Sequence, residues 1–530
     1  MKNDTITAKL IAEKDSQIAG LMAENARLSQ QVEWLMQQFR LAKHRQFGAS
    51  SEKSAYDQLN LFNEAEATAA ANMPEPELVK IEEHYRKRTR LVNDRLPDSL
   101  PVETVEHGLP AAECVCPECG GNLHVMGHET MRRELVIIPA QAKIVEHVRS
   151  IYACRDCEKG GCSVPIVKAP VDKPVIKGSF ASPEAIAHIM TQKFVMGAPL
   201  YRQEQDWNRQ GIMISRQTMS NWLIKAALDW LEPIYNALWK MLCCCYDILH
   251  ADETVLQVLR EPGKTPQSKS YMWLYRTSRY DPYGKEVRHP IVLYDYQPDR
   301  RSKHPAAFLK DFKGFCHTDG YDGYHALPGS ITVAGCWGHD RRKWDEALKV
   351  LPAKDREGSN ALRGKQYCDQ LFELERGFTD MQPDERLQKR LEFSKPVLDE
   401  FFAWAVSLNV LSKTLLGVAV NYTLSQRKYL EHYLLDGRLE ISNNRAERSI
   451  KPFVIDRKNF LFCNTPGGAR ASAIMFSIIE TAKENGLDPF AYLTYIFKNA
   501  PNWDIRNNSD ALNRLLPQSA PDYCMAGKSK

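Results

Sequence analysis

The stretch YDILHADETVLQV, residues 246–258, predicts a β-strand that carries a carboxylate in its middle. Side chains alternate along a strand, so Asp252 shares a face with Ile248 and Leu256. An aspartate among apolar strand residues is costly unless it is paired or binds a metal ion. The stretch therefore predicts a sheet and, within that sheet, a functional carboxylate.

Several further elements follow this strand. We expect strands within 270–280, 289–297 and 314–325, a helix within 301–312, and a fifth strand that runs into a basic helix within 331–347. This order of elements predicts an α/β layer. Asp319 lies at the C-terminal end of the fourth strand, so a second expected strand carries an acid. Asp322 is a spare candidate, although its DGY context is typical of a turn.

A third acid lies in LEISNNRAERSIKPFVIDRKNFLF, residues 439–462, after a long polar stretch with helical character. Asn443 can cap a helix, and Glu447 falls in the first turns of that helix. A site for phosphodiesters needs a carboxylate to bind metal and cations to hold the DNA backbone. An exposed helix with salt bridges explains the same charges equally well. The neighbouring basic residues are Arg445, Arg448, Lys451, Arg457 and Lys458.

Three histidines lie close to the acids in the sequence. His250, His317 and His339 are interpreted as satisfied histidines within the fold, and the alternative is that they orient ligands or water. Cys336 and His339 have the spacing of a pair of metal ligands. Without a second pair, this spacing is a weak indication of zinc.

Two Cys-x-x-Cys pairs predict a structural zinc site. Cys116 and Cys119 lie in CVCPECGG, and Cys154 and Cys157 lie in IYACRDC. Four thiolates can bind one tetrahedral zinc ion, and the intervening sequence predicts two strands joined around Pro139. A closed site of this kind folds its module and catalyses nothing. The spare soft ligands are Cys114, Cys162, His124 and His128.

Residues 4–42 predict one helix with a coiled-coil seam. Apolar residues occupy most a and d positions from Ile11 to Ala42, and Asn25 occupies an a position. A buried Asn pair fits a parallel dimer, and the alternative is a helix packed on its own chain. Residues 63–82 are rich in Ala, Glu and Pro, a composition typical of a linker.

Residues 183–231 predict three helices. Ser182 caps the first, the second runs from about Pro199 to Arg209, and Gly211 separates the second from a third that Ser215 caps. This is the helix-turn-helix pattern of DNA-binding proteins, although any helical hairpin gives it. The expected DNA contacts near the start of the third helix are Arg216, Gln217, Ser220 and Asn221.

Length and composition exclude several classes of protein. The chain has 530 residues, which predicts about three or four domains, and its formal net charge is only +4. No apolar run approaches the roughly 18 residues that a membrane span needs, and the N-terminus lacks the apolar segment of a secretory signal. We therefore expect a cytoplasmic protein with reduced thiols. Basic residues gather at 40–45, 86–90, 341–343 (which includes Arg341 and Arg342) and 445–458, where they suit contact with DNA.

Taken together, these segments resemble the insertion-sequence 66 family of bacterial DDE transposases. The motifs that carry the resemblance are FGASSEK, CPECGG, PLYRQEQ, HADET, TDGYDGY, GCWGHDRRKW, SNNRAERSIKP and RKNFLF. The resemblance implies a ribonuclease H-like catalytic core whose acidic triad, by motif match, is Asp252, Asp319 and Glu447. It also implies two Mg2+ or Mn2+ ions at the triad, nicking of element ends in double-stranded DNA, and joining of those ends to target DNA. Small companion proteins of the element are implied as well.

The motifs and the resemblance also predict the domain organisation. Because the arm is expected to dimerise, the chain should act as a homodimer or higher oligomer, associated with the bacterial nucleoid when it binds DNA. The expected segments are a coiled-coil arm at 1–48, a linker at 49–108, a zinc ribbon at 109–170, a helix-turn-helix domain at 180–235, a ribonuclease H-like core at 244–350 and 432–500, an α-helical insertion at 351–431 and a C-terminal tail at 501–530.

Two other functions fit parts of the sequence. A catalytically inactive, dimeric, zinc-containing DNA-binding regulator would explain the arm, the ribbon and the helix-turn-helix. It would not explain two acids on strands together with an acid in a basic helix. A metal-dependent, structure-specific nuclease would share the core and lack strand transfer. Assays of nicking and joining distinguish the three functions.

Overall fold

The computed structural model describes residues 142–153 and 166–527, together with the single helical residues 14, 20, 22, 32 and 36. The chain divides into two compact units, of which one contains residues 173–526 and the other residues 51–172. In the second unit, β1 (Ile151–Ala153) pairs antiparallel with β2 (Ile166–Lys168), while residues 142–150 form no regular element. The strand expected before the second cysteine pair is therefore shorter than predicted. The four expected zinc ligands and the coiled-coil seam as a whole lie outside the described residues.

The larger unit is a mixed α/β structure in which helices are the majority. Its strands are β3 (Ile248–Gln257), β4 (Lys269–Thr277), β5 (Val292–Gln297), β6 (Gly314–His317) and β7 (Ile331–Ala334). Its α-helices are α4 (Pro183–Phe194), α5 (Leu200–Arg209), α6 (Arg216–Ala226), α7 (Glu232–Cys245), α8 (Lys303–Phe308), α9 (Asp322–His325), α10 (Trp337–Lys349), α11 (Asn360–Gly377), α12 (Pro383–Lys389), α13 (Lys395–Ser407), α14 (Leu415–Glu431), α15 (Asn444–Phe460), α16 (Pro466–Glu484), α17 (Pro489–Asn499) and α18 (Ser509–Asn513). Short π or 3₁₀ turns are Ala227–Leu231, Ala353–Asp355, Arg390–Ser394, His432–Leu434, Pro517–Ser519 and Asp522–Cys524.

The five strands predicted from the sequence form one sheet in the order β5-β4-β3-β6-β7. β3, β4 and β5 pair antiparallel, whereas β6 runs parallel to β3 and β7 runs parallel to β6. Asp252 pairs with Leu274 on β4, and His250 pairs with both Arg276 on β4 and His317 on β6. The strand that carries Asp252 is therefore the middle strand of the sheet.

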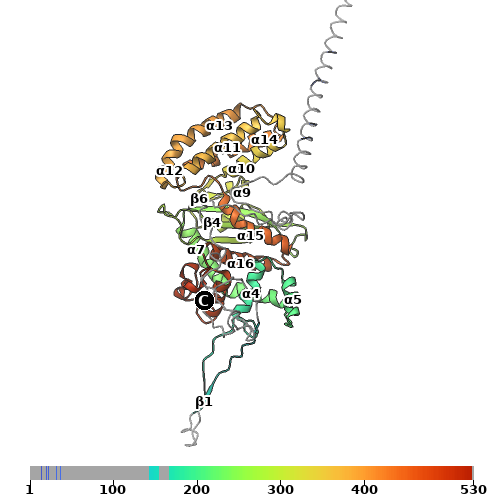
Figure 1. The fold of residues 1–530 in the computed structure, drawn as a ribbon, viewed down its shortest axis with the longest axis vertical. Coiled ribbons are helices and arrows are strands. Elements are labelled where there is room, and N and C mark those ends of the chain that lie inside the picture. Colours follow the sequence, from blue (N-terminus) through green and yellow to red (C-terminus); the bar gives the residue numbers. More distant parts are fainter. Residues whose placement is uncertain are drawn as a thin grey trace, which may run out of the picture. The chain divides into compact units, whose positions relative to one another are not determined.

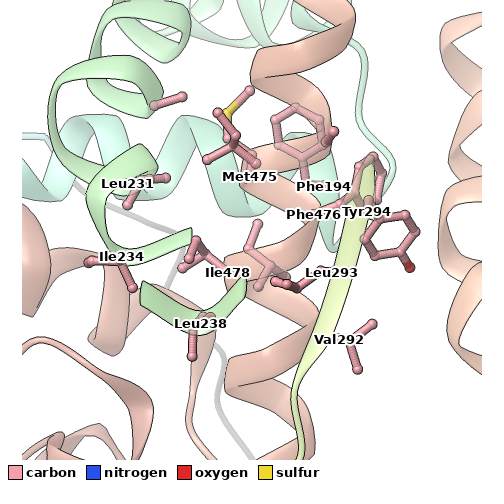
Figure 2. Packing of buried hydrophobic residues seen from close by; sticks show 14 of the residues in the cluster. Phe194, Leu231, Ile234, Leu238, Val292, Leu293, Tyr294, Met475, Phe476 and Ile478 are labelled. Atoms are coloured by element: carbon pink, nitrogen blue, oxygen red, sulfur yellow. The ribbon is translucent and has the colours of Figure 1, made fainter. Parts of the chain in front are cut away.

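Helix α16 covers the outer edge of β5. The Ser477 hydroxyl accepts a hydrogen bond from the backbone N–H of Tyr294 (2.7 Å), and the Thr481 hydroxyl accepts one from that of Val292 (3.0 Å). Phe194, Leu231, Ile234, Leu293, Met475, Phe476 and Ile478 pack around this contact (Figure 2). The edge donors that could pair with another chain are thus satisfied within the fold.

Helices α10, α11, α13 and α14 enclose a second apolar core, which Figure 1 shows beyond the sheet from α16. Trp337 and Trp344 of α10 pack in this core with Phe401 and Phe402 of α13. The buried carboxyl of Asp340 on α10 accepts a hydrogen bond from the Thr423 hydroxyl of α14 (2.6 Å). The long polar stretch between β7 and α15 is therefore folded into helices, as its composition predicts.

The three helices expected in 183–231 are present as α4, α5 and α6. Ser182 and Ser215 cap α4 and α6, since their hydroxyls accept hydrogen bonds from the N–H groups of Ala185 and Thr218. Gly211 has φ +76°, a conformation that glycine adopts without strain. The buried residues of α4 and α6 belong to the same core as those of the sheet, and both helices contact α16, which covers β5.

The residues interpreted as a C-terminal tail are instead part of this core. Ile505, Leu515, Leu516 and Cys524 are buried, and the Tyr492 hydroxyl of α17 donates a hydrogen bond to the carbonyl of Leu515 (2.6 Å). The prediction of a tail at 501–530 was wrong for residues 501–526. The structure describes only one short α-helix in this segment, α18, so the burial of its apolar residues depends on tertiary contacts.

Candidate active site

Asp252 lies where the middle strand emerges from the core. Residues 248–251 are buried on both faces of the sheet, and residues 252–255 are half-buried. One oxygen of the Asp252 carboxylate accepts a hydrogen bond from the N–H of Glu253 (2.8 Å). The strand therefore presents this carboxylate at the rim of the sheet, where a substrate can reach it.

Asp319 follows β6, the parallel neighbour of β3. Strand β6 ends at His317, two residues earlier than Asp319, and the Asp319 carboxylate accepts a hydrogen bond from the N–H of Tyr321 (3.0 Å). A Cβ atom at Gly320 would lie 2.6 Å from the Tyr422 hydroxyl of α14, so only glycine fits in this turn. The side chain of Asp322, the spare candidate, is 95% exposed. Asp319 is therefore the acid of the two that faces the sheet rim.

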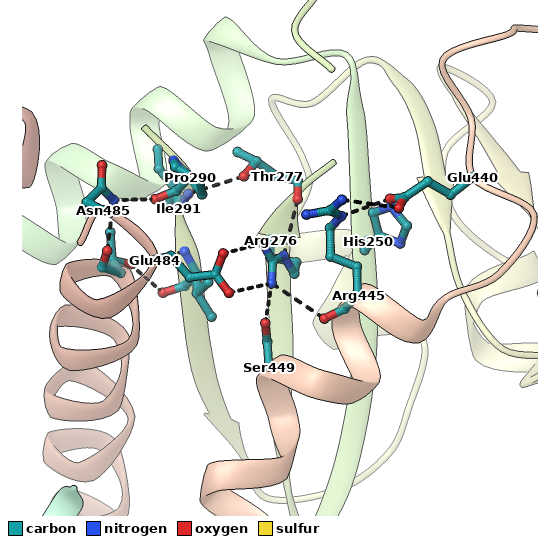
Figure 3. A network of polar contacts seen from close by, with 12 residues as sticks. His250, Arg276, Thr277, Pro290, Ile291, Glu440, Arg445, Ser449, Glu484 and Asn485 are labelled. Atoms are coloured by element: carbon teal, nitrogen blue, oxygen red, sulfur yellow. Dashed lines mark hydrogen bonds and ion pairs between the residues drawn. The ribbon is translucent and has the colours of Figure 1, made fainter. Parts of the chain in front are cut away.

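Glu447 lies in the first turns of α15, which packs on β3 and β4. Arg276 of β4 is 2% exposed and fixes this helix (Figure 3). Its guanidinium donates to the carbonyl of Arg445 (3.5 Å) and to the Ser449 hydroxyl, two groups that flank Glu447. Two more hydrogen bonds of 3.0 Å join Arg276 to Glu484 of α16.

The three expected triad residues share one electrostatic environment. Burial raises the pKa of Asp252 well above its usual range, and the negative charges of Glu253, Asp319 and Glu447 raise it further. Three elements far apart in the sequence therefore bring Asp252, Asp319 and Glu447 close enough for their charges to interact. Such a set of carboxylates is costly in the ionised state unless cations neutralise it.

This repulsion predicts a pH-dependent stability difference. The pKa of Asp252 is raised in the folded protein, so the folded state favours the protonated form of this group. The stability that Asp252 contributes is therefore fully present below its ordinary pKa of 3.8. It is lost as the pH rises through the raised pKa. Without added divalent ions, Asp252→Asn should therefore raise the apparent Tm, with a gain of about 1 kcal/mol that is larger near about pH 8 than near about pH 6. Thermal unfolding followed by circular dichroism measures this gain.

Asp322→Asn is the matched control, because the exposed Asp322 side chain should contribute less than about 0.5 kcal/mol. A gain for Asp252→Asn that is equal at both pH values, or a loss of stability, would contradict the raised pKa.

His339 lies beside Glu447, which the sequence did not indicate. Its Nδ1 is 3.6 Å from Glu447 Oε1, and Arg342 lies 3.5 Å from Glu447 Oε2. One ligand atom from each of Cys336, His339 and Glu447 can be chosen so that all three lie within 4.8 Å of one another. The interpretation of His339 as a satisfied histidine stays a prediction, since its Nδ1 is buried without a hydrogen-bond partner but lies within ion-pair distance of Glu447.

Glu253 is a second residue near the site that sequence reasoning did not find. Its side chain is 2% exposed, accepts a hydrogen bond from the Tyr324 hydroxyl (2.5 Å) and forms an ion pair with Arg300. The Arg300 guanidinium also lies 4.0 Å from Asp319 and stacks on the Tyr321 ring. Arg300 therefore links the residue that follows Asp252 to the turn that holds Asp319. The sequence features that could have indicated this contact are the acid pair Asp252 and Glu253 in HADET and Arg300, 47 residues after Glu253.

His250 and His317 form a buried pair behind the carboxylates. Their rings stack with centroids 5.0 Å apart, and the His250 nitrogens lie 2.8 Å from Asn443 Oδ1 and 2.9 Å from Glu440 Oε2 (Figure 3). Burial lowers the pKa of His317 to about 3. Although burial alone would raise the pKa of Glu440, hydrogen bonds and charge from His250 and Arg445 hold it below its usual range.

Asn443 occupies the N-cap position of α15, but its side chain makes no cap hydrogen bond. The amide nitrogen instead donates to the carbonyl of Ala251 (2.8 Å), next to Asp252. Asn443 therefore lies at the predicted cap position, but the prediction that its side chain caps the helix is wrong. The side-chain amide bonds instead to partners on the buried sheet.

The basic residues expected to bind DNA fall into two groups. Arg445 pairs with Glu440 (2.9 Å), Arg457 donates to the Thr254 hydroxyl (3.1 Å), and Arg341 pairs with Asp369 (2.5 Å). These three side chains have intramolecular partners that hold the fold together. The exposed members are Arg216, Gln217, Asn221, Arg342, Arg448, Lys451 and Lys458.

Models of protein families match four segments of the chain. A model described as "Transposase IS66 family" matches residues 178–471, which span the sheet and all three carboxylates. The chain belongs to this family. It is a transposase, an enzyme that cleaves DNA and transfers DNA strands. A model of the IS66 C-terminal element matches residues 477–518, which include residues 501–518 of the expected tail.

Two further models match the N-terminal part of the transposase. A "zinc-finger binding domain of transposase IS66" matches residues 113–158, which contain both Cys-x-x-Cys pairs and support structural zinc. A model described as "Transposase C of IS166 homeodomain" matches residues 34–105, so it covers all of residues 63–82, whose composition predicts a linker. Among the helices that the structure describes, none is long and apolar enough to span a membrane.

Similar proteins occur in Sinorhizobium fredii (strain NBRC 101917 / NGR234). The transposase is 30% identical over 432 residues to "Uncharacterized protein y4jD", with 80% of this chain and 81% of that protein covered. It is 28% identical over 493 residues to "Uncharacterized protein y4hP", with 89% and 85% covered. These matches extend the family relationship over most of the chain.

Proposed function

We propose that Asp252, Asp319 and Glu447 form the catalytic triad of this transposase and hold two Mg2+ or Mn2+ ions. The observation that carries the proposal is the sheet, in which β6 runs parallel to β3 and ends just before Asp319, while the helix with Glu447 packs on β3. The charges of Asp319 and Glu447 raise the pKa of Asp252, which supports one shared site for the three carboxylates. They come from the middle strand, from the end of a parallel strand and from a helix that crosses the sheet.

The sheet supports a ribonuclease H-like core. Three antiparallel strands followed by two parallel strands, in the order β5-β4-β3-β6-β7, place the first strand in the centre. Asp252 on that strand and Asp319 after its parallel neighbour then lie side by side. The core we propose spans 244–350 and 432–500, with an α-helical insertion at 351–431.

The residues present fit divalent metal ions. Oxygen donors suit Mg2+ and Mn2+, and Glu447 Oε1 is buried without a hydrogen-bond partner. When bound, the ions would supply charge that activates a water or DNA 3′-hydroxyl and stabilises the leaving 3′-oxygen. Arg300 and the N–H groups of Glu253 and Tyr321 hold the Asp252 and Asp319 carboxylates in place.

Exposed cations beside Glu447 would bind the DNA backbone. Arg342 and Arg448 are exposed close to this carboxylate in space or in sequence, and Lys451 and Lys458 are exposed further along α15. Phosphate contacts of this kind fix the register of the duplex and carry no sequence information. We propose that these four residues position the scissile phosphodiester over the triad.

The remaining parts of the chain have proposed roles as well. We propose that Cys116, Cys119, Cys154 and Cys157 bind structural Zn2+, that residues 1–48 dimerise as a coiled coil, and that the transposase works in the bacterial cytoplasm, at the nucleoid when it is bound to DNA. We also propose that the transposase works with small companion proteins encoded by the same element.

One assay tests the function against its alternatives. Purified transposase is incubated with DNA that carries element ends, with a target plasmid, and with either Mg2+ or no divalent ion. We expect ion-dependent nicking followed by joining. Nicking without joining would support a nuclease, and binding of the ends without nicking would support an inactive regulator.

The helix-turn-helix proposal makes its own prediction. Gln217 and Asn221 are exposed one turn apart on α6, with Gln217 Nε2 3.1 Å from Asn221 Oδ1, where they can reach base edges. Gln217→Ala should weaken binding to element ends by about 1–3 kcal/mol and leave binding to unrelated DNA nearly unchanged. Fluorescence anisotropy with both duplexes measures this difference.

Arg448→Ala is the matched comparison. Loss of a phosphate contact should weaken binding to both duplexes alike and reduce the dependence of affinity on salt. If Gln217→Ala also affects both duplexes equally, then α6 does not read the sequence of the element end.

A further inference from the structure

Two buried atoms beside the triad face each other without a hydrogen-bond partner. His339 Nδ1 and Glu447 Oε1 are both inaccessible to solvent and unpaired, and they lie 3.6 Å apart. That distance is too long for a hydrogen bond between them. Buried polar atoms in folded proteins almost always have a partner, so this gap needs an occupant.

The surroundings of the gap are set by three elements. His339 lies in the first turn of α10, directly after β7, and Glu447 lies in the first turns of α15. The other oxygen of Glu447 faces Arg342, 3.5 Å away, so Oε1 alone is available to the gap.

We propose that His339 is a fourth protein ligand of the active site, which binds through Nδ1 the divalent ion that Glu447 holds. This inference rests on the proposed triad. Two donor atoms that each lie about 2.1 Å from one ion are about 3.0–3.6 Å apart for ligand angles between about 90° and 120°. The observed separation falls at the upper end of that range and needs little movement.

Cys336 does not complete this site, although its sulfur is near. The side chain is fully buried, and Sγ accepts a hydrogen bond from the N–H of Asn443 (3.1 Å). Soft thiolate ligands suit ions such as zinc and copper, whereas Mg2+ and Mn2+ suit harder ligands. Cys336 therefore fixes the start of α15 against α10 and leaves His339 as the nitrogen donor.

An imidazole ligand changes which ion the site prefers. Carboxylate ligands suit both Mg2+ and Mn2+, whereas an imidazole ligand suits transition-metal ions. The transposase should consequently bind Mn2+ more tightly than Mg2+.

The test uses the full-length transposase, purified with its zinc, and Mn2+ alone as the probe. Electron paramagnetic resonance of free Mn2+ gives the affinity, and electron spin-echo modulation reports any nitrogen bound to the ion. We expect nitrogen modulation in the wild-type protein. His339→Gln should remove that modulation and weaken Mn2+ binding at least about tenfold.

Three further variants sharpen the result. His339→Asp supplies an oxygen ligand in place of the imidazole, so this variant should bind Mn2+ without nitrogen modulation. Its Mn2+ binding would show that loss of binding in His339→Gln does not come from a folding defect. Cys336→Ser should keep the modulation, since its sulfur is not a ligand. His289→Gln is the matched control, because the exposed His289 pairs with Asn485 (3.2 Å) and has no part in the site.

Nitrogen modulation that is absent from the wild-type protein, or that persists in His339→Gln, would overturn the inference. That failure is distinct from failure of the triad. If His339 is not a ligand but Asp252→Ala abolishes nicking, the proposed function stands. If Asp252→Ala still nicks DNA, the triad itself is wrong.

Discussion

Replacement of Asp252 or Asp319 by alanine is expected to lower the rate of end nicking and of joining at least about 1000-fold while binding to element ends remains near normal. In the proposed site, each carboxylate would contact the ions that the reaction requires. The Asp252 carboxylate is at the rim of the middle strand, and the Asp319 carboxylate is held in its turn by the N–H of Tyr321. Single-turnover assays with labelled ends measure both steps, and anisotropy measures binding.

The repeat TDGYDGY supplies the control. Asp322 has the same DGY context as Asp319, but its side chain is 95% exposed. Asp322→Ala should therefore keep activity within about threefold of wild type, since surface substitutions usually have small effects. Equal losses in Asp319→Ala and Asp322→Ala would show that the motif acts through the fold of the turn and would contradict the triad.

Arg390→Ala is expected to destabilise the larger unit by about 3–5 kcal/mol. The Arg390 side chain is fully buried in the helical insertion and pairs with Glu375. It also donates to the carbonyls of Tyr433 (3.0 Å), Asp436 (3.1 Å) and Leu439 (2.7 Å). Its loss would leave a buried carboxylate and three carbonyls without their partner. Denaturant unfolding followed by circular dichroism measures the change.

This substitution also tests how the insertion supports the site. The three carbonyls belong to the segment that ends at Glu440, the partner of His250 and Arg445. Arg390→Ala should therefore lower nicking as well as stability. Arg376→Ala on α11 is the control, because Arg376 is exposed and its loss should change stability by less than about 0.5 kcal/mol. A small effect for Arg390→Ala would mean that water replaces its hydrogen bonds.

The strands and the helix-turn-helix could be predicted because their signals are local. The run at 246–258 contains its own alternation and length, and Ser182 and Ser215 lie at the start of α4 and α6, where their hydroxyls act. Asp252, Asp319 and Glu447 were found through motifs. Their mutual proximity follows from the sheet order, which the sequence does not state.

The contacts that local patterns could not predict join residues far apart in the chain. Glu253 reads as an ordinary strand residue until Arg300 and Tyr324 are placed beside it. Asn443 reads as a helix cap, yet its amide bonds to Ala251, 192 residues earlier. His339 reads as a core histidine because its neighbour Glu447 belongs to a helix that begins after the whole insertion. In each case a long-range partner competes successfully with the local one.

The insertion has a consequence for the synthesis of the enzyme. At about 5–20 residues per second, the ribosome adds the 195 residues between Asp252 and Glu447 in about 10–40 s. During that interval α4–α6 are already complete, whereas α15 and the segment with Glu440 and Asn443, which support β3, do not yet exist. A nascent chain can therefore complete its first helices before it contains all the residues that we propose for DNA cleavage.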